Sequence, residues 1–337
     1  MEKVTIFFHG NCFDGAISAA LFKNFYEEGL RKEATFTFVP LSHEVGFSYD
    51  DRMFTGDVNV VLDFRYPPSD KVHWWFDHHR TTFINTEDRV HLDNRENGDQ
   101  FQWDPEAPSN TGMMLRIFTE QFGFTTEPWH ESLVAWADII DSASFDSPDV
   151  AVELLEPAMA FTFLLDHNRD PELLTRFINE VADGATMEEL ALIPFWSKKL
   201  NSHRQRCWDL VEDIKGLLEV KSRVSYVALT QSPVSGYNKF IPYYLAPLVN
   251  YSVALIRLER GYKVSVGVNP WSPPARPLDL GKLCNQYGGG GHFSVGGIPF
   301  YHDQAERAEE VAMEILELLR EKTTTEQDTR KKELLDK

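Results

Sequence analysis

The N-terminal stretch Val4-Thr5-Ile6-Phe7-Phe8 decides the fold of this chain. It is an almost continuous apolar run, which is typical of a strand that is covered on both faces of a sheet. Residues 11–15 are turn-like, and residues 16–26 then carry apolar side chains at helical spacing. Strand, loop and helix in this order predict the first unit of a doubly wound parallel sheet.

The pattern continues along the first half of the chain and changes after Gly216. Further strands are expected at 35–39, 58–62, 72–76, 224–229, 252–258 and 262–268. Helices are expected from 109 to 118, and at 131–140, 171–181, 187–214, 277–287 and 305–320, with a kink at Pro194. We therefore predict an α/β fold in which a doubly wound parallel sheet is linked by a helix to a smaller α/β domain.

The predicted organisation has four parts. A metal-binding catalytic domain covers 1–185, a helical connector covers 186–216 and a substrate-binding domain covers 217–320. The last part, 321–337, is a charged, Thr-rich tail without apolar periodicity, which we expect to be frayed or disordered.

Composition is that of a soluble globular protein. The chain has 337 residues, 42% of them hydrophobic, yet no apolar run approaches the roughly 20 residues that span a membrane. The chain starts directly with a strand and shows no signal peptide, so we expect a cytoplasmic protein with no membrane partner. Cys12, Cys207 and Cys284 are widely spaced and odd in number, which favours reduced thiols over disulfides.

The net charge restricts the class of ligand. Lysine and arginine number 33 against 52 aspartates and glutamates, so 33 − 52 gives −19. A surface this acidic repels a polyanion, which argues against long duplex nucleic acid as a partner. A small anionic substrate is compatible with this charge if metal ions supply local positive charge.

Acidic residues and histidines gather at predicted strand and helix ends. The four clusters are His9 with Asp14, Asp63, Asp77-His78-His79, and Asp138 with Asp141. Singly each has a simpler explanation, since an aspartate after a strand is usually a helix cap or turn residue. Parallel strands would deliver the first three clusters to one edge of the sheet, where carboxylates without cations would repel each other. A pair of divalent ions such as Mn²⁺, Fe²⁺, Co²⁺ or Zn²⁺ resolves the repulsion and suits displacement at phosphorus.

A second informative string is Gly288-Gly289-Gly290-Gly291-His292. Successive glycines let backbone N–H groups approach an anion closely and form a nest around it. His292 would then donate a hydrogen bond to a phosphate. A flexible glycine-rich turn is the alternative interpretation, although the nearby pair Gly296-Gly297 suggests a tightly packed loop.

These strings resemble the DHH/DHHA1 branch of the DHH phosphoesterase superfamily, which includes nanoRNases and RecJ-like phosphodiesterases. The resembling stretches are His9-Gly-Asn-Cys-Phe-Asp14-Gly15, Val61-Leu62-Asp63, Asp77-His78-His79, Ile140-Asp141-Ser142-Ala-Ser-Phe145, and Leu280-Gly-Lys-Leu-Cys-Asn-Gln-Tyr-Gly288-Gly-Gly-Gly-His292-Phe-Ser-Val-Gly296-Gly297. They follow the family's order and touch both halves of the chain.

The resemblance implies two Mn²⁺ ions, with Mg²⁺ or Co²⁺ as alternatives. It implies that Asp63 bridges both metals, that His9 holds the first, and that Asp14, His78 and Asp141 hold the second. It also implies that His79 contacts the substrate phosphate while Asp77 orients the histidines. The implied substrate-binding residues are Asn11, Arg80, Gly289, Gly290, Gly291 and His292.

The sequence departs from this family pattern in three places. Many members carry two aspartates in the first motif, and the earlier position falls here at Cys12 or Phe13, neither of which suits Mn²⁺. Asn11 or Asp138 are candidates to fill the gap. In the fourth motif both Asp138 and Asp141 fit, with Asp141 preferred. Many members also carry an arginine before the glycine-rich loop, where this chain has Gly267, with Arg257 or Arg260 on the neighbouring strand as replacements.

The predicted function is a Mn²⁺-dependent phosphodiesterase that hydrolyses short oligonucleotides or linear or cyclic dinucleotides to mononucleotides. One alternative is a polyphosphatase or a 3′-phosphonucleotide phosphatase, which would use the same metals. The other is a non-catalytic nucleotide-binding protein whose first metal site has decayed. A homodimer is compatible with each.

Overall fold

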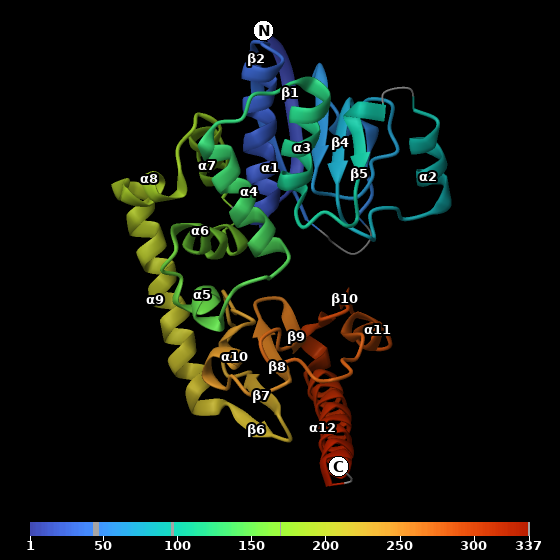
Figure 1. The fold of residues 1–337 in the computed structure, drawn as a ribbon, viewed down its shortest axis with the longest axis vertical. Helices are drawn as coiled ribbons and strands as arrows, with labels where there is room; N and C mark the ends of the chain where they lie inside the picture. Colours follow the sequence, from blue (N-terminus) through green and yellow to red (C-terminus); the bar gives the residue numbers. More distant parts are fainter. Residues whose placement is uncertain (43–46, 96–97, 169, 336–337) are drawn as a thin grey trace. The chain divides into compact units, whose positions relative to one another are not determined.

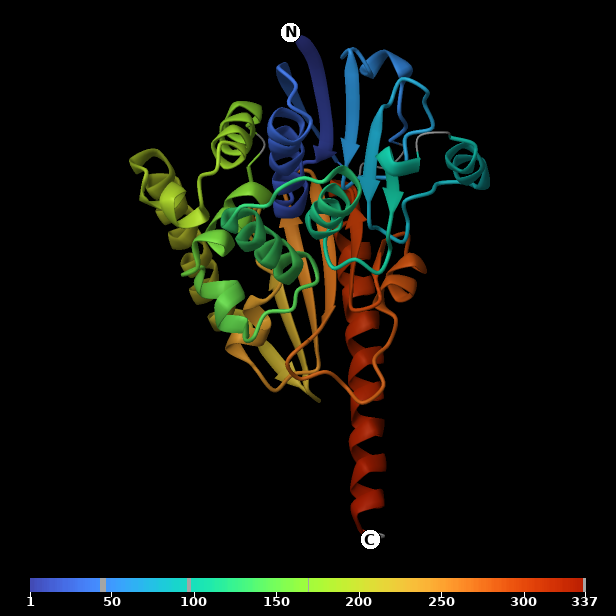
Figure 2. The same ribbon diagram turned by 45° about the horizontal axis from the view of Figure 1, so that its top comes forward.

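The computed structural model describes residues 1–42, 47–95, 98–168 and 170–335. The chain forms two compact units, shown in Figures 1 and 2. The first contains Met1–Phe145 and Leu155–Asn201, and the second contains Asp146–Leu154 and Ser202–Lys337. The predicted domain boundaries at 185, 216 and 320 stay predictions.

The first unit contains a five-stranded sheet in which every neighbouring pair is parallel. Its strands are β1 (Glu2–His9), β2 (Ala34–Leu41), β3 (Val58–Leu62), β4 (Trp74–Asp77) and β5 (Phe101–Trp103), in the order β2-β1-β3-β4-β5. All five residues of β3 and all four of β4 are buried. The predicted parallel sheet is therefore confirmed, while the short strand β5 was not predicted.

Two helices cover one face of this sheet. They are α1 (Phe13–Asn24) and α3 (Asn110–Phe122), which Figure 1 shows beside the strands. Trp74 of β4 packs edge-on against Phe22 of α1, with ring centroids 5.6 Å apart. Phe76 of the same strand packs against Phe118 of α3 at 5.5 Å. The aromatic residues of β4 thus fix α1 and α3 on the sheet.

The opposite face is covered mainly by connecting segments. Phe7, Val61, Trp75 and Phe101 occupy one row across four strands. Side chains from the β2–β3 and β3–β4 connections, the 3₁₀ helix η2 (Asp51–Met53) and helix α2 (Thr86–Asp93) pack on this row. The side chains that the β2–β3 connection contributes to this cover are Phe47, Tyr49, Met53 and Phe54.

The remaining elements of the first unit are mostly helical. They are the π-helix η1 (Phe25–Gly29), the 3₁₀ helix η3 (Gly98–Gln100), α4 (Pro128–Asp141), α6 (Pro157–Asp166), α7 (Pro171–Ala182), α8 (Met187–Leu192) and the start of α9 (Pro194–Leu217). Pro194 breaks the predicted helix 187–214 completely instead of kinking it. Ile193 is extended, and Pro194 starts α9, because proline lacks a backbone N–H and disfavours helical backbone in the residue before it.

The second unit has a mixed six-stranded sheet in the order β10-β11-β9-β8-β7-β6. Its strands are β6 (Glu219–Lys221), β7 (Val224–Leu229), β8 (Tyr251–Leu258), β9 (Gly261–Val268), β10 (Gly290–His292) and β11 (Val295–Phe300). Only β7 and β8 pair in parallel. The helices are α5 (Pro148–Glu153), α10 (Ile241–Leu245), α11 (Leu280–Asn285), η4 (His302–Gln304) and α12 (Ala305–Leu335).

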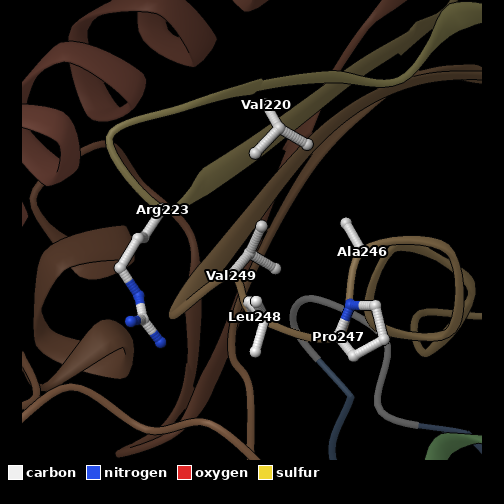
Figure 3. Close-up of a pocket in the computed structure, with 6 residues that line it drawn as sticks. All are labelled: Val220, Arg223, Ala246, Pro247, Leu248 and Val249. Atoms are coloured by element: carbon white, nitrogen blue, oxygen red, sulfur yellow. The ribbon is translucent and has the colours of Figure 1, made fainter.

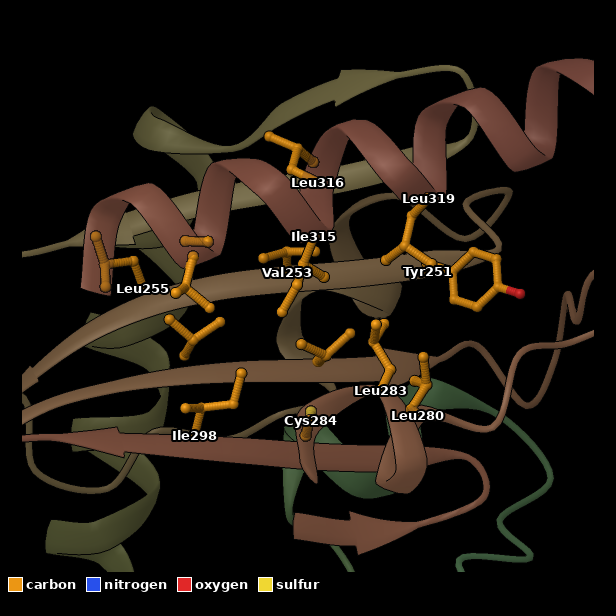
Figure 4. Close-up of a cluster of buried hydrophobic side chains, with 14 of the residues drawn as sticks. Tyr251, Val253, Leu255, Leu280, Leu283, Cys284, Ile298, Ile315, Leu316 and Leu319 are labelled. Atoms are coloured by element: carbon orange, nitrogen blue, oxygen red, sulfur yellow. The ribbon is translucent and has the colours of Figure 1, made fainter. Parts of the chain in front are cut away.

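Helix α12 builds the core of the second unit. Figure 4 shows Ile315 beside Val253 of β8 and Leu319 beside Tyr251 of the same strand, and all four side chains are buried. The spacing of these helix residues places them on one stripe of α12, so the amphipathic pattern determines which face packs on the sheet.

The predicted frayed tail is wrong for residues 321–335, because α12 continues to Leu335. The hydroxyl of buried Thr323 donates to the carbonyl of Ser222 at 2.6 Å and so ties this part of the helix to the unit. The lysine, glutamate and leucine residues that follow are good helix formers even without an apolar stripe. Within the described residues no helix is long and apolar enough to cross a membrane.

Candidate metal centre

The strand order of the first unit creates a topological switch point. The chain leaves β1 towards β2 on one side, and β3 lies on the other side of β1. Ligands in open parallel sheets bind beyond the carboxyl ends of the strands at such a point. His9 is the last residue of β1, and Asp63 directly follows β3. Two of the predicted site residues, His9 and Asp63, therefore lie at the sheet edge where folds of this kind bind ligands.

His78 stands next to three carboxylates. Its Nε2 atom lies 3.3 Å from Asp141 Oδ2, 3.6 Å from Asp63 Oδ1 and 3.8 Å from Asp14 Oδ2. Asp14 is in the first turn of α1, while Asp141 ends α4. Four segments that are distant in the sequence thus place one imidazole and three carboxylates together, as the sequence predicted.

Asp63 is the centre of this arrangement. Its side chain is fully buried, and Oδ2 lies 3.3 Å from His9 Nδ1 while Oδ1 lies 3.6 Å from His79 Nδ1. Burial opposes its ionisation, yet His78 and His9 hold the pKa of Asp63 well below its usual range. Neither oxygen has a hydrogen-bond partner among the described residues. Because buried carboxylates almost always have partners, these two oxygens fit the role of metal ligands.

The backbone at Asp63 supports the same interpretation. Asp63 has a φ of 53°, in the left-handed region that residues other than glycine rarely adopt. Such strained backbone is concentrated at functional sites, where the surrounding structure holds it. Asn11, just beyond β1, has a φ of 60°. Two turns beside the switch point therefore have left-handed backbone at a residue other than glycine.

Asp14 is fixed by the start of helix α3. The backbone N–H groups of Asn110 and Thr111 donate to its two oxygens at 2.7 and 2.9 Å, and the Thr111 hydroxyl donates at 2.5 Å. A helix N-terminus stabilises a carboxylate, so α3 holds Asp14 in position. Gly15 is needed beside it, because a Cβ atom there would lie 2.2 Å from the His9 carbonyl oxygen.

Asp77 positions the two histidines that follow it. Its Oδ1 atom accepts hydrogen bonds from His78 N at 2.9 Å, His79 N at 3.2 Å and His79 Nδ1 at 2.7 Å. The Thr82 hydroxyl donates to Oδ2, and Asp77 is fully buried. Asp77 therefore orients the backbone of both residues and the ring of His79.

The tautomer of His78 follows from its other contact. Nδ1 lies 3.0 Å from the carbonyl oxygen of Ala107, and a carbonyl can only accept, so Nδ1 carries the proton. In the neutral ring the lone pair is then on Nε2, the atom next to the three carboxylates. Nε2 has no hydrogen-bond partner among the described residues, and this combination is typical of a histidine that ligates a metal.

The charges in the site are strongly coupled. Burial alone would lower the pKa of His78, but Asp63, Asp14 and Asp141 raise it to about 10. Burial would also lower the pKa of His79, but Asp77 and Asp63 raise it to about 9. Burial, together with Asp63 and Asp141, raises the pKa of Asp14 to about 7. Protons on these groups supply positive charge that bound cations would replace.

Three groups of side chains bring ligand atoms within 4.8 Å of one another. They are His9 with Cys12 and Asp63, Asp63 with His78 and His79, and Asp14 with His78 and Asp141. We call these seven residues the metal-ligand cluster. Cys12 is the member that the sequence prediction rejected, although it occupies the position of the expected aspartate. Burial raises the pKa of its thiol well above the usual range.

The structure places three other candidates differently. Asp138 accepts a hydrogen bond from the Ser109 hydroxyl at 2.5 Å, next to the N-terminus of α3, and belongs to none of the three ligand groups. Arg80 is exposed and forms an ion pair with Glu106 at 2.7 Å. Asn11 is half-buried in the turn after β1.

The glycines of the second unit form a tight hairpin, which we define as residues 288–297. β10 and β11 pair antiparallel, with Gly291 opposite Gly296. A Cβ atom at Gly291 would lie 2.2 Å from the Val295 carbonyl oxygen, and one at Gly289 would lie 2.3 Å from the Gly297 carbonyl oxygen. His292 is exposed at the end of β10. This glycine-rich hairpin is thus an ordered strand pair with exposed backbone.

A shallow hollow elsewhere in the second unit has a different character (Figure 3). It has a volume of about 250 Å³ and is lined by Val220, Arg223, Ala246, Pro247, Leu248 and Val249. Its only charged lining residue, Arg223, donates to the Ser272 hydroxyl at 2.8 Å. With no carboxylate, imidazole or thiol in its lining, this hollow lacks the groups for acid–base or metal chemistry.

Comparison with known proteins supports the fold. The structure is similar to that of PggH, a pGpG-specific phosphodiesterase from Vibrio cholerae, with a TM-score of 0.65 and 19% sequence identity. The match covers 97% of this chain and 100% of the PggH chain. The exonuclease RecJ bound to manganese matches 92% of this chain and 89% of its own, with a TM-score of 0.52 and 10% identity. This chain has the fold of the DHH/DHHA1 phosphoesterases.

RecJ from Thermus thermophilus in complex with Mn²⁺ also matches, over 92% of this chain and 51% of its own, with a TM-score of 0.54 and 10% identity. No protein-family model and no curated protein matches the chain. The predicted resemblance is therefore confirmed at the level of the fold.

Proposed function

We propose that this protein is a metal-dependent phosphodiesterase that hydrolyses short oligonucleotides or linear or cyclic dinucleotides to mononucleotides. The observation that carries the proposal is the fully buried carboxylate of Asp63, whose oxygens have no hydrogen-bond partner within the described part of the chain. It lies at the switch point of a parallel sheet, among histidines and two more carboxylates. Such a donor set suits two divalent ions.

The residues that would hold the two ions follow from the ligand groups. Asp63 would bridge both, with His9 on the first ion and Asp14, His78 and Asp141 on the second. Mn²⁺ fits the second set of ligands, and Mg²⁺ or Co²⁺ would substitute. When bound, a metal pair activates a water for attack at phosphorus and neutralises the charge that develops on the phosphoryl oxygens.

His79 and Asp77 would act on the substrate side of the site. Asp77 holds the His79 ring through Nδ1, which leaves Nε2 as the second polar atom of the ring. A protonated His79 then has an Nε2–H group to donate to a phosphate oxygen. Asn11, in the turn after β1, and Arg80, in the loop after β4, are further candidates for contacts to the substrate.

Net charge and the second unit support short substrates. A chain with a charge of −19 disfavours a long polyanion, while metal ions would attract a small anionic one. Gly290 and Gly291 are exposed, so their backbone would contribute to a phosphate nest, and His292 would donate to the same anion. Gly289, whose N–H donates to the Cys284 carbonyl at 3.0 Å, would shape the turn beside the nest. PggH, which is a pGpG-specific phosphodiesterase, belongs to the proposed class of enzyme.

A cytoplasmic location and a homodimeric state belong to the same proposal. The three cysteines of the chain are all free thiols, which suits a reducing compartment. Light scattering on the purified protein would establish whether it forms a dimer.

The test is a product assay with Mn²⁺, Mg²⁺ or Co²⁺ over a panel of linear dinucleotides, cyclic dinucleotides, five-nucleotide RNA, single-stranded DNA and polyphosphate. We expect mononucleotides from the dinucleotides and little turnover of the long polymers. Activity on polyphosphate alone would contradict the proposal and favour a polyphosphatase. No turnover of any substrate at full metal occupancy would favour a binding protein.

A further inference from the structure

We propose that Cys12 is a thiolate ligand of the first metal, in the position where an aspartate was expected. The first metal position would then prefer Fe²⁺, Co²⁺ or Zn²⁺ over Mn²⁺ and Mg²⁺. This inference rests on the metal centre of the proposed function and is independent of the substrate.

The position of Cys12 is set by the turn between β1 and α1. Cys12 is the N-cap residue of α1, with extended backbone (φ −140°, ψ 137°). His9 ends the strand on one side of this turn, and Asp14 lies in the first helical turn on the other side. The same short segment thus supplies His9 to the first metal position and Asp14 to the second.

The geometry groups Cys12 with two of the proposed ligands. Its sulfur, a ring nitrogen of His9 and a carboxylate oxygen of Asp63 all lie within 4.8 Å of one another. Zinc bonds to sulfur and to nitrogen are about 2.0–2.3 Å long, so this spacing suits three ligands of a single ion. The three groups also combine sulfur, nitrogen and oxygen, which is a donor set found in metal sites.

Asp63 supplies independent support for a cation at this position. Its buried side chain faces Cys12 and His9, and Oδ2, the atom nearest His9, has no hydrogen-bond partner in the described structure. In the absence of a metal, the imidazoles of His9, His78 and His79 are the groups next to this carboxylate. A divalent ion at this position would bind the carboxylate and the deprotonated thiol at once.

The chemistry of sulfur determines which ions are favoured. Thiolate is a soft ligand that selects borderline ions, and Mn²⁺ is the weakest binder among the divalent first-row metals. The second ligand group, Asp14 with His78 and Asp141, contains oxygen and nitrogen only. The two metal positions should therefore differ in preference, with Mn²⁺ tolerated at the second and disfavoured at the first.

The other two cysteines have a different environment and provide matched controls. Cys207 is 1% exposed, and its thiol donates to the carbonyl of Val152 at 3.4 Å. Cys284 is buried against Gly296, where a Cβ atom would lie 2.4 Å from its sulfur. Neither belongs to a ligand group among the described residues, so both thiols serve packing.

The test is a Co²⁺ titration of the full-length protein followed by absorption spectroscopy. We expect a sulfur-to-cobalt charge-transfer band in the near ultraviolet, retained in Cys207→Ala and Cys284→Ala and lost in Cys12→Ser. Absence of the band in the unaltered protein, or its persistence in Cys12→Ser, would overturn the inference. The band reports the bond between sulfur and cobalt directly, so this test does not depend on whether the protein hydrolyses any substrate.

A second variant addresses folding and metal preference. Cys12→Asp restores the expected carboxylate, so it should bind metal without the band. In competition it should shift the affinity ratio from Co²⁺ towards Mn²⁺ by about tenfold or more, since even changes to outer-shell partners alter metal affinity by 10–100-fold. An unchanged ratio would contradict thiolate ligation. A cobalt band without hydrolysis of any substrate would support this inference and refute the proposed function.

Discussion

The metal-ligand cluster of the first unit and the glycine-rich hairpin of the second unit are built by opposite means. The cluster depends on buried charged side chains that other side chains and helix α3 hold in place. The hairpin depends on the absence of side chains, because Gly289 and Gly291 allow two backbone strands to approach closely. One region concentrates charge in the interior, and the other exposes polar backbone.

The difference shows where substitutions should act. In the cluster, the buried carboxylate of Asp63 has no hydrogen-bond donor within the described residues, so its removal should affect metal binding and turnover more than folding. In the hairpin, an added methyl group meets backbone atoms, so the first effect should be on stability.

The largest effect is expected for Asp63→Ala. It removes the proposed bridging carboxylate, and the loss of metal-ion charge stabilisation, worth several kcal/mol, should lower kcat by about a thousandfold or more. Steady-state kinetics measures this, with circular dichroism to confirm folding. Asp138→Asn is the matched control, because Asp138 accepts a hydrogen bond from Ser109 and belongs to none of the ligand groups, and it should lower kcat far less. An equal fall in kcat in both variants would contradict the special role of Asp63.

A second test uses His130, a buried histidine outside the cluster, whose pKa is shifted in the opposite direction to that of His78. Burial lowers the pKa of His130 to about 4, whereas the carboxylates raise that of His78 to about 10. His130 Nδ1 accepts from the Glu127 N–H, and its Nε2 faces Asn24 Oδ1, so the neutral ring is the form that fits.

Protonation of His130 therefore favours the unfolded chain, in which the pKa is 6.5. Its contribution to stability is complete above pH 6.5 and is lost as the pH falls towards 4, by up to about 3 kcal/mol. Urea unfolding of the protein and of His130→Asn between pH 7 and pH 4 measures the difference. Identical pH dependence in both would show that burial of His130 has no such effect.

Asp77→Asn should weaken the cluster without removing a ligand. The amide keeps the shape of Asp77 but loses the charge that orients the His79 ring, so metal affinity or kcat should fall by about 10–100-fold. Thr82→Val, which removes the hydroxyl donor to Asp77, should produce a smaller loss in the same direction. Metal titration and kinetics report both. If Asp77→Asn retained full activity, Asp77 would have no positioning role.

The smallest effect is expected in the hairpin. Gly291 has a φ of 150° and no space for a Cβ atom, so Gly291→Ala should lower the free energy of unfolding by about 1–3 kcal/mol. Gly290 has nothing within 4 Å of a Cβ position, and Gly290→Ala should leave stability nearly unchanged. Denaturant unfolding compares the two. A rise in KM for Gly290→Ala without loss of stability would point to substrate contact at this backbone.

The sequence predicted the parts of the fold that carry long apolar runs. β3 and β4 are buried on both faces, so their residues show the expected pattern. β5 and β10 have three residues each, too few to show alternation, and β10 is mostly glycine. The extent of α12 was missed because charged helix formers beyond residue 320 leave no apolar stripe.

The candidate site was predictable where the proposed ligands lie at strand ends, as His9 and Asp63 do. The sequence supported only a preference for Asp141 over Asp138, because both lie at the end of one helix, and side-chain distances are needed to separate them. Cys12 was dismissed because the sequence was compared with a Mn²⁺ site. Its proximity to His9 and Asp63 depends on the turn after β1, which no local pattern reveals.

The most direct test of the central claim is to count bound metal ions. The purified protein is saturated with Mn²⁺ or Co²⁺, freed of excess metal, and analysed by elemental analysis beside Asp63→Ala. We expect two ions per chain in the unaltered protein at saturation with Co²⁺ and a loss of both tightly bound ions in the variant. Fewer than two ions with no turnover, or equal metal content in Asp63→Ala, would contradict it.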